Sequence, residues 1–221
     1  EIYPIGVKPD GFNINDGCGA TCPEFMASNV VDFNADFGIS LDGDADRLIL
    51  SDENGKIYNG DQIIATLAVD MANKGILKSN VIGTQMSNLG LEEFLKKNKI
   101  GFFRTSVGDR YILEQLIKDN GTLGGEPSGH ILMPTISRSG DGLIAALKIL
   151  EIICKSNKTP SSILNKFFPV PQKLENLKNI DKSILRNSEV LKKIKSLQND
   201  IGSNGRILLR PSGTEPLIRV M

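Results

Sequence analysis

Apolar residues follow two spacings along the middle of the chain, one typical of strands and one typical of helices. Short apolar-rich runs bounded by turn residues predict strands at 36–41, 47–51, 56–58, 80–86, 101–105 and 122–125. Apolar positions three and four residues apart predict helices at 61–71, 88–97, 108–118 and 139–155. Asp61 and Asn88 are the expected N-caps of the first two helices. The third helix is expected to face inward with four residues, Tyr111, Ile112, Leu116 and Ile117.

Strand and helix alternate with short connections from about residue 80 to 126, which favours an α/β unit with a largely parallel sheet. The pattern changes after residue 158. Three prolines and two adjacent phenylalanines in 158–171 predict a linker. A lysine-rich amphipathic helix at 183–197 and strands at 206–210 and 217–221 then predict an α+β region. We therefore place a domain boundary near residue 165.

Composition excludes several classes of protein. The 221 residues include 26 Lys and Arg and 26 Asp and Glu, so no basic field favours nucleic acid or an anionic membrane. No apolar run is long enough to span a bilayer. Three cysteines are too few for a disulfide scaffold, which favours reduced thiols in a cytoplasmic protein. The chain begins at Glu1 and ends at Met221 in strand-like apolar runs, so we expect a segment of a longer protein.

An acidic loop, Asp42–Arg47, lies between two predicted strands. Alternating carboxylates at Asp42, Asp44 and Asp46 are suited to one hard cation, and Arg47 either braces the loop or reaches a phosphate. One alternative is a solvated acidic turn. A second is a calcium loop of the EF-hand kind with Glu53 at its last position, although Arg47 stands where that loop needs glycine.

A glycine-rich loop, 124–130, follows another predicted strand. Glu126 and Ser128 offer an acceptor and a donor suited to sugar hydroxyls, and His130 is the only histidine in the chain. The alternative for His130 is a hydrogen-bonded structural histidine. Residues 9–24 are rich in turn-forming residues and predict an irregular loop.

A third loop, 210–216, combines cationic and neutral donors suited to a phosphate group. Its candidate ligands are Arg210, Ser212, Gly213 and Thr214, with Arg219 on the following strand. The alternative is a capped hairpin turn. A cation loop, a hydroxyl-binding loop and a phosphate loop together indicate a phosphorylated sugar as ligand, but none of them supplies a nucleophile.

These motifs, in this order, resemble those of the α-D-phosphohexomutase superfamily, and especially its glucosamine-phosphate branch. The matching stretches are 10–21 (DGFNINDGCGAT), 42–47 (DGDADR), 107–111 (VGDRY), 125–130 (GEPSGH), 140–142 (GDG) and 210–221 (RPSGTEPLIRVM). The resemblance implies mixed sheets with flanking helices in an α/β fold, followed by a partial α+β C-terminal domain. It divides the chain into the end of a second domain (1–57), a third domain (58–163) and an incomplete fourth (164–221). The first domain of the family, which carries the phosphoserine loop, is expected to lie outside the chain.

The resemblance also implies a reaction, the interconversion of glucosamine 6-phosphate and glucosamine 1-phosphate through a phosphoserine and a bisphosphorylated sugar, in amino-sugar and cell-wall precursor synthesis. It implies the following roles: Mg²⁺ binding for Asp42, Asp44 and Asp46; catalysis for Arg47 and His130; sugar binding for Glu126 and Ser128; phosphate binding for Arg210, Ser212, Gly213, Thr214 and Arg219. Pro127 departs from the Gln or Asn more usual in that branch. The alternatives are a phosphoglucomutase or phosphomannomutase, or a sugar-phosphate-binding module without catalysis. Whether the protein forms a homodimer stays open.

Overall fold

A computed structural model describes residues 1–202, 205–212 and 217–221, without the side chain of Lys182. The chain divides into two compact units, Glu1–Pro169 and Val170–Met221. The further division of the first unit at residue 57 stays a prediction. Among the described residues, no helix is long and apolar enough to cross a membrane.

The first sheet of unit 1 is antiparallel and covered by a helix that the sequence pattern did not predict. Its strands are β1 (Phe37–Leu41), β2 (Leu48–Asp52) and β3 (Ile57–Tyr58), in that order. Helix α1 (Pro23–Asp32) begins at a proline, which suits the first turn of a helix. It packs against β1, where a Cβ on Gly38 would collide with Met26 and Val30. The strand expected near Ile2 is wrong, because residues 1–22 form neither helix nor strand.

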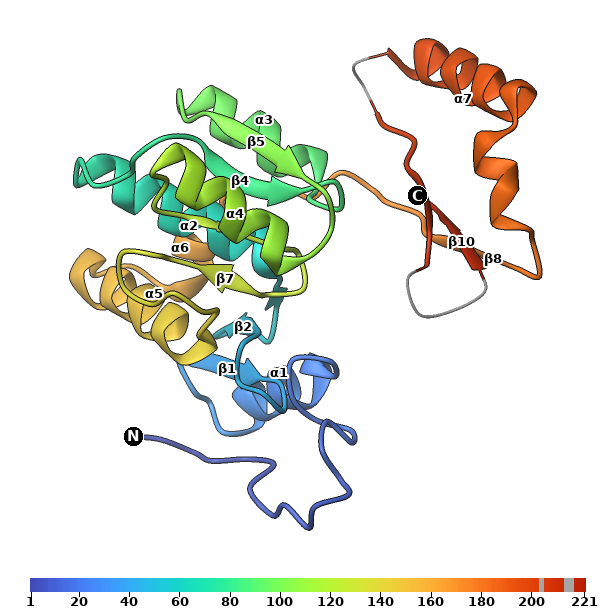
Figure 1. Cartoon of the computed structure of the whole chain (residues 1–221). Helices are drawn as coiled ribbons and strands as arrows, with labels where there is room; N and C mark the ends of the chain where they lie inside the picture. Colours follow the sequence, from blue (N-terminus) through green and yellow to red (C-terminus); the bar gives the residue numbers. More distant parts are fainter. Residues whose placement is uncertain (203–204, 213–216) are drawn as a thin grey trace. The chain divides into compact units, whose positions relative to one another are not determined.

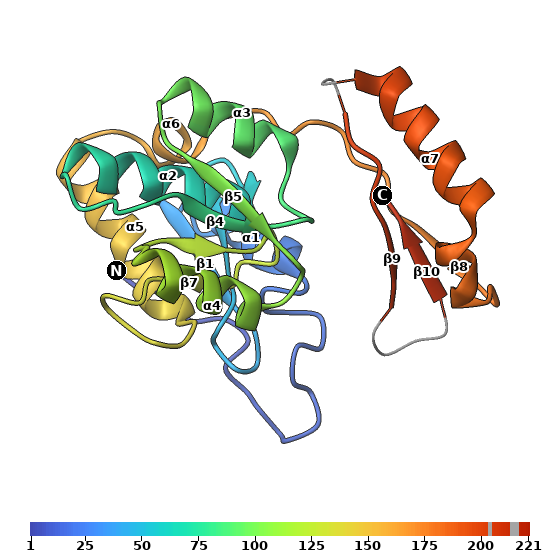
Figure 2. The same ribbon diagram turned by 45° about the horizontal axis from the view of Figure 1, so that its top comes forward.

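The second sheet is mixed and has the strand order β5-β4-β6-β7. The strand β4 pairs in parallel with β5 and β6, whereas β7 is antiparallel to β6. Helix α4 contacts the sheet strands, while α2 contacts α3, α5 and α6, as Figures 1 and 2 show. The bounds are β4 (Val81–Thr84), β5 (Phe102–Thr105), β6 (Gly124–Gly125), β7 (Ile131–Leu132), α2 (Gly60–Asn73), α3 (Leu89–Lys97), α4 (Asp109–Asp119), α5 (Gly142–Ser156) and α6 (Pro160–Leu164). The predicted α/β class with flanking helices is confirmed.

Two cores form on this architecture. A small core joins Ile82 and Leu132 of the sheet to Ile112 and Leu116 of α4. A larger core brings Val81 and Ile131 of the same sheet, with apolar residues of β2, together with α2, α3 and α5. Alternate strand residues therefore contribute to different cores, as the two faces of a sheet require.

Two expectations about helices are wrong. Tyr111 and Ile117 of α4 are 49% and 69% exposed, because only one narrow stripe of this helix faces the sheet. Asp61 does not cap α2. Asn59 is the cap, in a capping box with Gln62, and the buried carboxylate of Asp61 accepts a hydrogen bond from the Asn88 amide at the start of α3.

A buried carboxylate organises the turn between β2 and β3. Asp52 is 1% exposed and accepts hydrogen bonds from the amides of Asn54 and Lys56 and from the Tyr58 hydroxyl, at 2.9, 3.0 and 2.8 Å. Burial and the neighbouring Asp52 raise the pKa of Tyr58, which therefore stays a neutral donor.

Glu53, the next residue, fixes helix α6 to this hairpin. Its carboxylate accepts hydrogen bonds from the hydroxyl and the amide of Ser161. Burial by itself would raise the pKa of Glu53, but the hydrogen bonds that its carboxylate accepts from Ser161, Asn54 and its own backbone together outweigh burial and lower the pKa. The predicted linker at 158–171 thus contains a short docked helix.

Unit 2 is built on an antiparallel sheet with the strand order β8-β10-β9. Its strands are β8 (Glu175–Lys178), β9 (Leu209–Pro211) and β10 (Leu217–Val220), and its helices are η1 (Lys182–Arg186) and α7 (Ser188–Ile201). Helix α7 starts later than predicted because Asn187 caps it, accepting hydrogen bonds from the amides of Glu189 and Val190.

We predict that Tyr58→Phe destabilises unit 1 by about 1–3 kcal/mol, because it leaves a buried carboxylate oxygen without its donor. Urea unfolding of the variant and of the unchanged chain measures the difference. Tyr111→Phe, at a half-exposed tyrosine of α4, is the control and is expected to change stability by less than about 0.5 kcal/mol. Equal effects at the two positions would contradict the role given to the Asp52 contact.

The first residue of α2 supports the loop 126–130. The Gly60 amide donates to the Pro127 carbonyl at 3.1 Å, and a Cβ on Gly60 would collide with the Glu126 carbonyl. We predict that Gly60→Ala costs about 1–3 kcal/mol, since backbone on both sides must move. Thermal unfolding tests this, with Asn73→Ala at the exposed end of the same helix as control. A stability equal to that of the control would refute the predicted close contact.

Candidate functional site

The acidic loop is braced by its own arginine. The Arg47 amide donates to Asp42 Oδ1 at 3.2 Å, and the Arg47 Nε lies 3.6 Å from Asp42 Oδ2 and 4.0 Å from Asp46 Oδ1. Ala45 holds the loop in a tight turn at φ 58°, and its amide donates to the Asp42 carbonyl. These contacts are of the bracing kind, and the expected role of Arg47 toward a phosphate stays a prediction.

The acidic loop and the loop 126–130 meet at one junction in unit 1. The Leu48 amide donates to the Gly129 carbonyl at 3.0 Å, and Arg47 and His130 form an antiparallel bridge. His130 is 7% exposed, and its Nδ1 lies 3.2 Å from Asp46 Oδ2. The structure therefore places Arg47, His130 and Asp46 together, as a shared site requires.

The two predicted sugar ligands lie on the same loop with different exposure. Ser128 is exposed, whereas Glu126 is half-buried and accepts a hydrogen bond from the Gly108 amide at 3.1 Å. Gly108 is the residue directly before α4 and, as a glycine, has no side chain with which to cap that helix. Its backbone φ of 131° is one that favours glycine. The Glu126 carboxylate is thus placed where the positive end of the helix dipole favours a negative charge.

The carboxylates of the acidic loop do not converge as a prepared metal site. Within the part of the chain that the structure describes, no three His, Cys, Asp or Glu side chains are grouped closely enough to hold one ion. Asp44 is exposed, while Asp42 and Asp46 face Arg47 and His130. Oxygen donors of this kind suit Mg²⁺, but in this arrangement Arg47 and His130 face two of the three carboxylates.

The calcium-loop alternative is wrong. The flanking segments β1 and β2 are strands, and the Glu53 carboxylate is engaged by Ser161 instead of the acidic loop. An EF-hand loop needs helices on both sides and a glutamate that reaches the ion.

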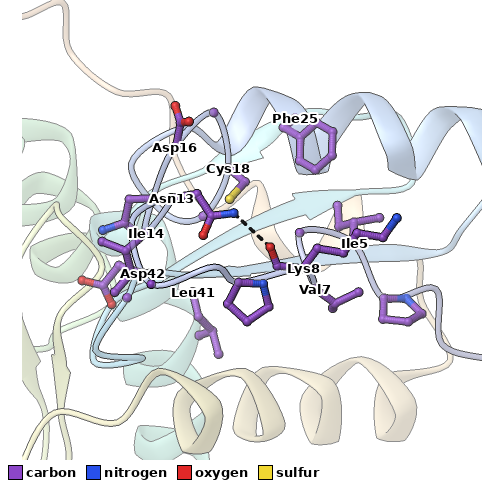
Figure 3. Close-up of a pocket in the computed structure, with 18 residues that line it drawn as sticks. Ile5, Val7, Lys8, Asn13, Ile14, Asp16, Cys18, Phe25, Leu41 and Asp42 are labelled. Atoms are coloured by element: carbon purple, nitrogen blue, oxygen red, sulfur yellow. Dashed lines mark hydrogen bonds between the residues drawn. The ribbon is translucent and has the colours of Figure 1, made fainter.

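A pocket of about 730 Å³ borders one end of the acidic loop. Residues 4–19 form most of its wall, and Leu41, Asp42 and Gly43 close one side, as Figure 3 shows. The Asn13 side-chain amide donates to the Lys8 carbonyl at 2.9 Å within that wall. Glu126, Ser128 and His130 do not line this pocket, so it is separate from the predicted sugar ligands.

Unit 2 places the two predicted phosphate-binding arginines side by side. Arg210 of β9 and Arg219 of β10 are directly paired in the antiparallel register, and the amide of buried Ser212 donates to the Leu217 carbonyl at 2.9 Å. Adjacent like charges on paired strands are costly unless an anion or other acceptor lies near. Gly213 and Thr214 lie outside the described residues.

Three glycines shape the site without a role predicted for them from the sequence: Gly60, Gly108 and Gly142. Gly142, the first residue of α5, donates its amide to the Ala45 carbonyl at 2.8 Å. Gly108 and Gly142 lie in the motifs VGDRY and GDG, and membership of these motifs is the sequence signal that could have identified them. Their contacts join segments far apart in the sequence, so no local pattern shows them.

Two family models match consecutive parts of the chain. The model described as phosphoglucomutase/phosphomannomutase, alpha/beta/alpha domain III, matches residues 59–170, and the C-terminal domain model matches residues 170–221.

Curated relatives match over the whole chain. The phosphoglucosamine mutase of Granulibacter bethesdensis is 48% identical over 221 residues, which cover 100% of this chain and 48% of that protein. The phosphoglucosamine mutase of Bradyrhizobium diazoefficiens is 46% identical over 222 residues, covering 100% of this chain and 50% of that protein. The chain spans about half the length of the curated relatives it matches.

Solved structures show the same fold. An N-acetylglucosamine-phosphate mutase in its product complex matches with a TM-score of 0.74 at 21% identity, covering 93% of this chain and 49% of that one. The Aspergillus fumigatus N-acetylphosphoglucosamine mutase in complex with GlcNAc-6P and magnesium matches with a TM-score of 0.72 at 23% identity, with the same coverage of each chain. The predicted resemblance is confirmed: the chain belongs to the phosphoglucomutase/phosphomannomutase family.

Proposed function

We propose that the complete protein containing this chain is a mutase that interconverts glucosamine 6-phosphate and glucosamine 1-phosphate. The observation that carries the proposal is the junction at which His130 contacts Asp46 and the Leu48 amide binds the Gly129 carbonyl. This junction brings an acidic loop suited to phosphoryl chemistry against a loop suited to sugar hydroxyls. The identity to proteins named phosphoglucosamine mutase favours the amino sugar among phosphorylated hexoses.

Each of the three candidate loops has a proposed task. Glu126 and Ser128 bind sugar hydroxyls, and Arg210, Ser212, Gly213, Thr214 and Arg219 bind the phosphate that does not react, which orients the sugar. Arg47 stabilises charge on the transferred phosphoryl group, and His130 assists proton transfer at the reacting oxygen. The phosphoryl group itself would come from a phosphoserine outside this chain.

Magnesium binding by Asp42, Asp44 and Asp46 belongs to the proposal in a restricted form. A solved relative of the same fold is in complex with magnesium, and the three side chains offer hard oxygen donors. Because Arg47 faces two of these carboxylates here, the ion would have to displace the guanidinium or rearrange the loop. No step of the reaction is assigned to the ion.

Two alternatives keep the same residues. A phosphoglucomutase or phosphomannomutase would use the junction for a neutral sugar, and the matching family bears the names of both enzymes. A binding module without catalysis would retain the sugar and phosphate ligands alone.

In the complete protein, we predict that glucosamine 6-phosphate is converted faster than glucose 6-phosphate or mannose 6-phosphate. Glu126→Gln is expected to lower kcat/KM for glucosamine 6-phosphate about 10- to 100-fold, because the charge-assisted hydrogen bond from a sugar hydroxyl becomes a neutral one. Glu93→Gln, at an exposed residue of α3, is the control. Faster turnover of either neutral sugar would favour the first alternative. Binding of the phosphates without turnover of any would favour the second.

We predict that Asp44→Asn abolishes Mg²⁺ binding at micromolar to millimolar concentration, because it removes one of the three proposed carboxylate ligands. The variant is expected to stay folded, because Asp44 is exposed and asparagine has the same shape. Isothermal titration of the complete protein with MgCl₂ measures the affinity. Asp32→Asn, at the exposed end of α1, is the matched control. Unchanged affinity in Asp44→Asn would remove the metal-site proposal while leaving the sugar assay untouched.

A further inference from the structure

Gly140 lies against the imidazole of His130, closer than any other residue type would permit. A Cβ built on Gly140 would stand 2.5 Å from His130 Cε1 and closer still to Nε2. Real Cβ atoms do not approach other atoms so closely. The Nε2 atom is buried and has no hydrogen-bond partner among the described residues. The contact between the ring and Gly140 is therefore one of van der Waals packing.

Backbone conformation does not explain this glycine. Gly140 is not among the residues with positive φ, unlike Gly108 and Gly129. A glycine without a left-handed conformation is required only where another group approaches its α-carbon closely. The approaching group here is the His130 ring.

The backbone at neither position can move away to relieve a side chain at position 140. The segment after Gly140 is fixed because Asp141 caps α5 by accepting from the Ile144 amide at 2.8 Å, and the Gly142 amide donates to the Ala45 carbonyl. The His130 backbone is fixed by its bridge to Arg47 and by the bond that the Glu126 amide donates to its carbonyl. Only the imidazole ring is left to rotate.

We propose that Gly140 is a positioning residue for the mutase reaction: because it has no side chain beside the imidazole, it allows the ring orientation that brings His130 Nδ1 against Asp46. This inference rests on the proposed function for its effect on catalysis. The contact itself is independent of that function, because it follows from the packing of three segments of unit 1. The same packing gives the Gly-Asp-Gly motif at 140–142 a physical role beyond starting α5.

The first test uses the ring signals of His130, the only histidine of this 221-residue chain. Heteronuclear NMR of the chain is expected to show displaced ring signals in Gly140→Ala and unchanged ones in Ser139→Ala, the exposed neighbouring control. Ring signals that are the same in Gly140→Ala and in the unchanged chain would overturn the proposal.

The second test holds even if Gly140→Ala folds poorly. In a double-mutant cycle, Gly140→Ala is expected to lower the thermal unfolding midpoint of the unchanged chain but not that of His130→Ala, where the ring has been removed. An equal loss in both backgrounds, or a double variant that fails to fold when His130→Ala folds, would show that the clash is not with His130.

The third test separates positioning from mere packing. In the complete protein, Gly140→Ala is expected to lower kcat about 100-fold with a much smaller change in KM, as expected for a misplaced reacting group. An unchanged kcat would overturn the positioning role. If the unchanged complete protein has no mutase activity, the proposed function fails, whereas the NMR and unfolding results still decide the contact.

Discussion

The hydrogen bond between the Leu48 amide and the Gly129 carbonyl joins the two sheets of unit 1, and the candidate site depends on it. It continues the backbone pairing of β2 onto the loop that follows β6, so residues more than eighty positions apart in the sequence become neighbours. Gly129 permits this at φ 94°, since a Cβ there would lie 2.8 Å from Leu48 N and closer still to its carbonyl oxygen. The contact between Asp46 and His130 is a consequence of this backbone pairing.

Glycines act at this junction in two different ways. Gly108 supplies a backbone angle that other residues adopt at a cost, and Gly60 and Gly140 supply the absence of a side chain at a close approach. Gly129 does both. Motif patterns show where the glycines are but do not distinguish these causes. The distinction matters for function, because a glycine of the second kind identifies the group that it lies against.

Arg47 offsets part of the negative charge of the acidic loop. Asp46 faces His130 on one side and Arg47 on the other, and Asp42 faces the same guanidinium. Such an arrangement lowers the repulsion among the carboxylates without an ion. It also explains why a loop with a metal-binding pattern in sequence does not present three converging ligands.

The sequence predicts the strands and helices of residues 80–126, the positions of the acidic loop and of the loop 126–130, and the family, because apolar spacing and local motifs are encoded over a few neighbouring residues. It did not predict α1 or α6, whose starts depend on prolines within stretches rich in turn residues. The folded structure is needed to see that the acidic loop meets the loop 126–130 and that Arg47 faces Asp42 and Asp46. It also decided that Glu126 receives the Gly108 amide and that Gly140 lies on His130. The physical reason is that these contacts depend on how the two sheets pack, and packing joins residues between which no local pattern runs.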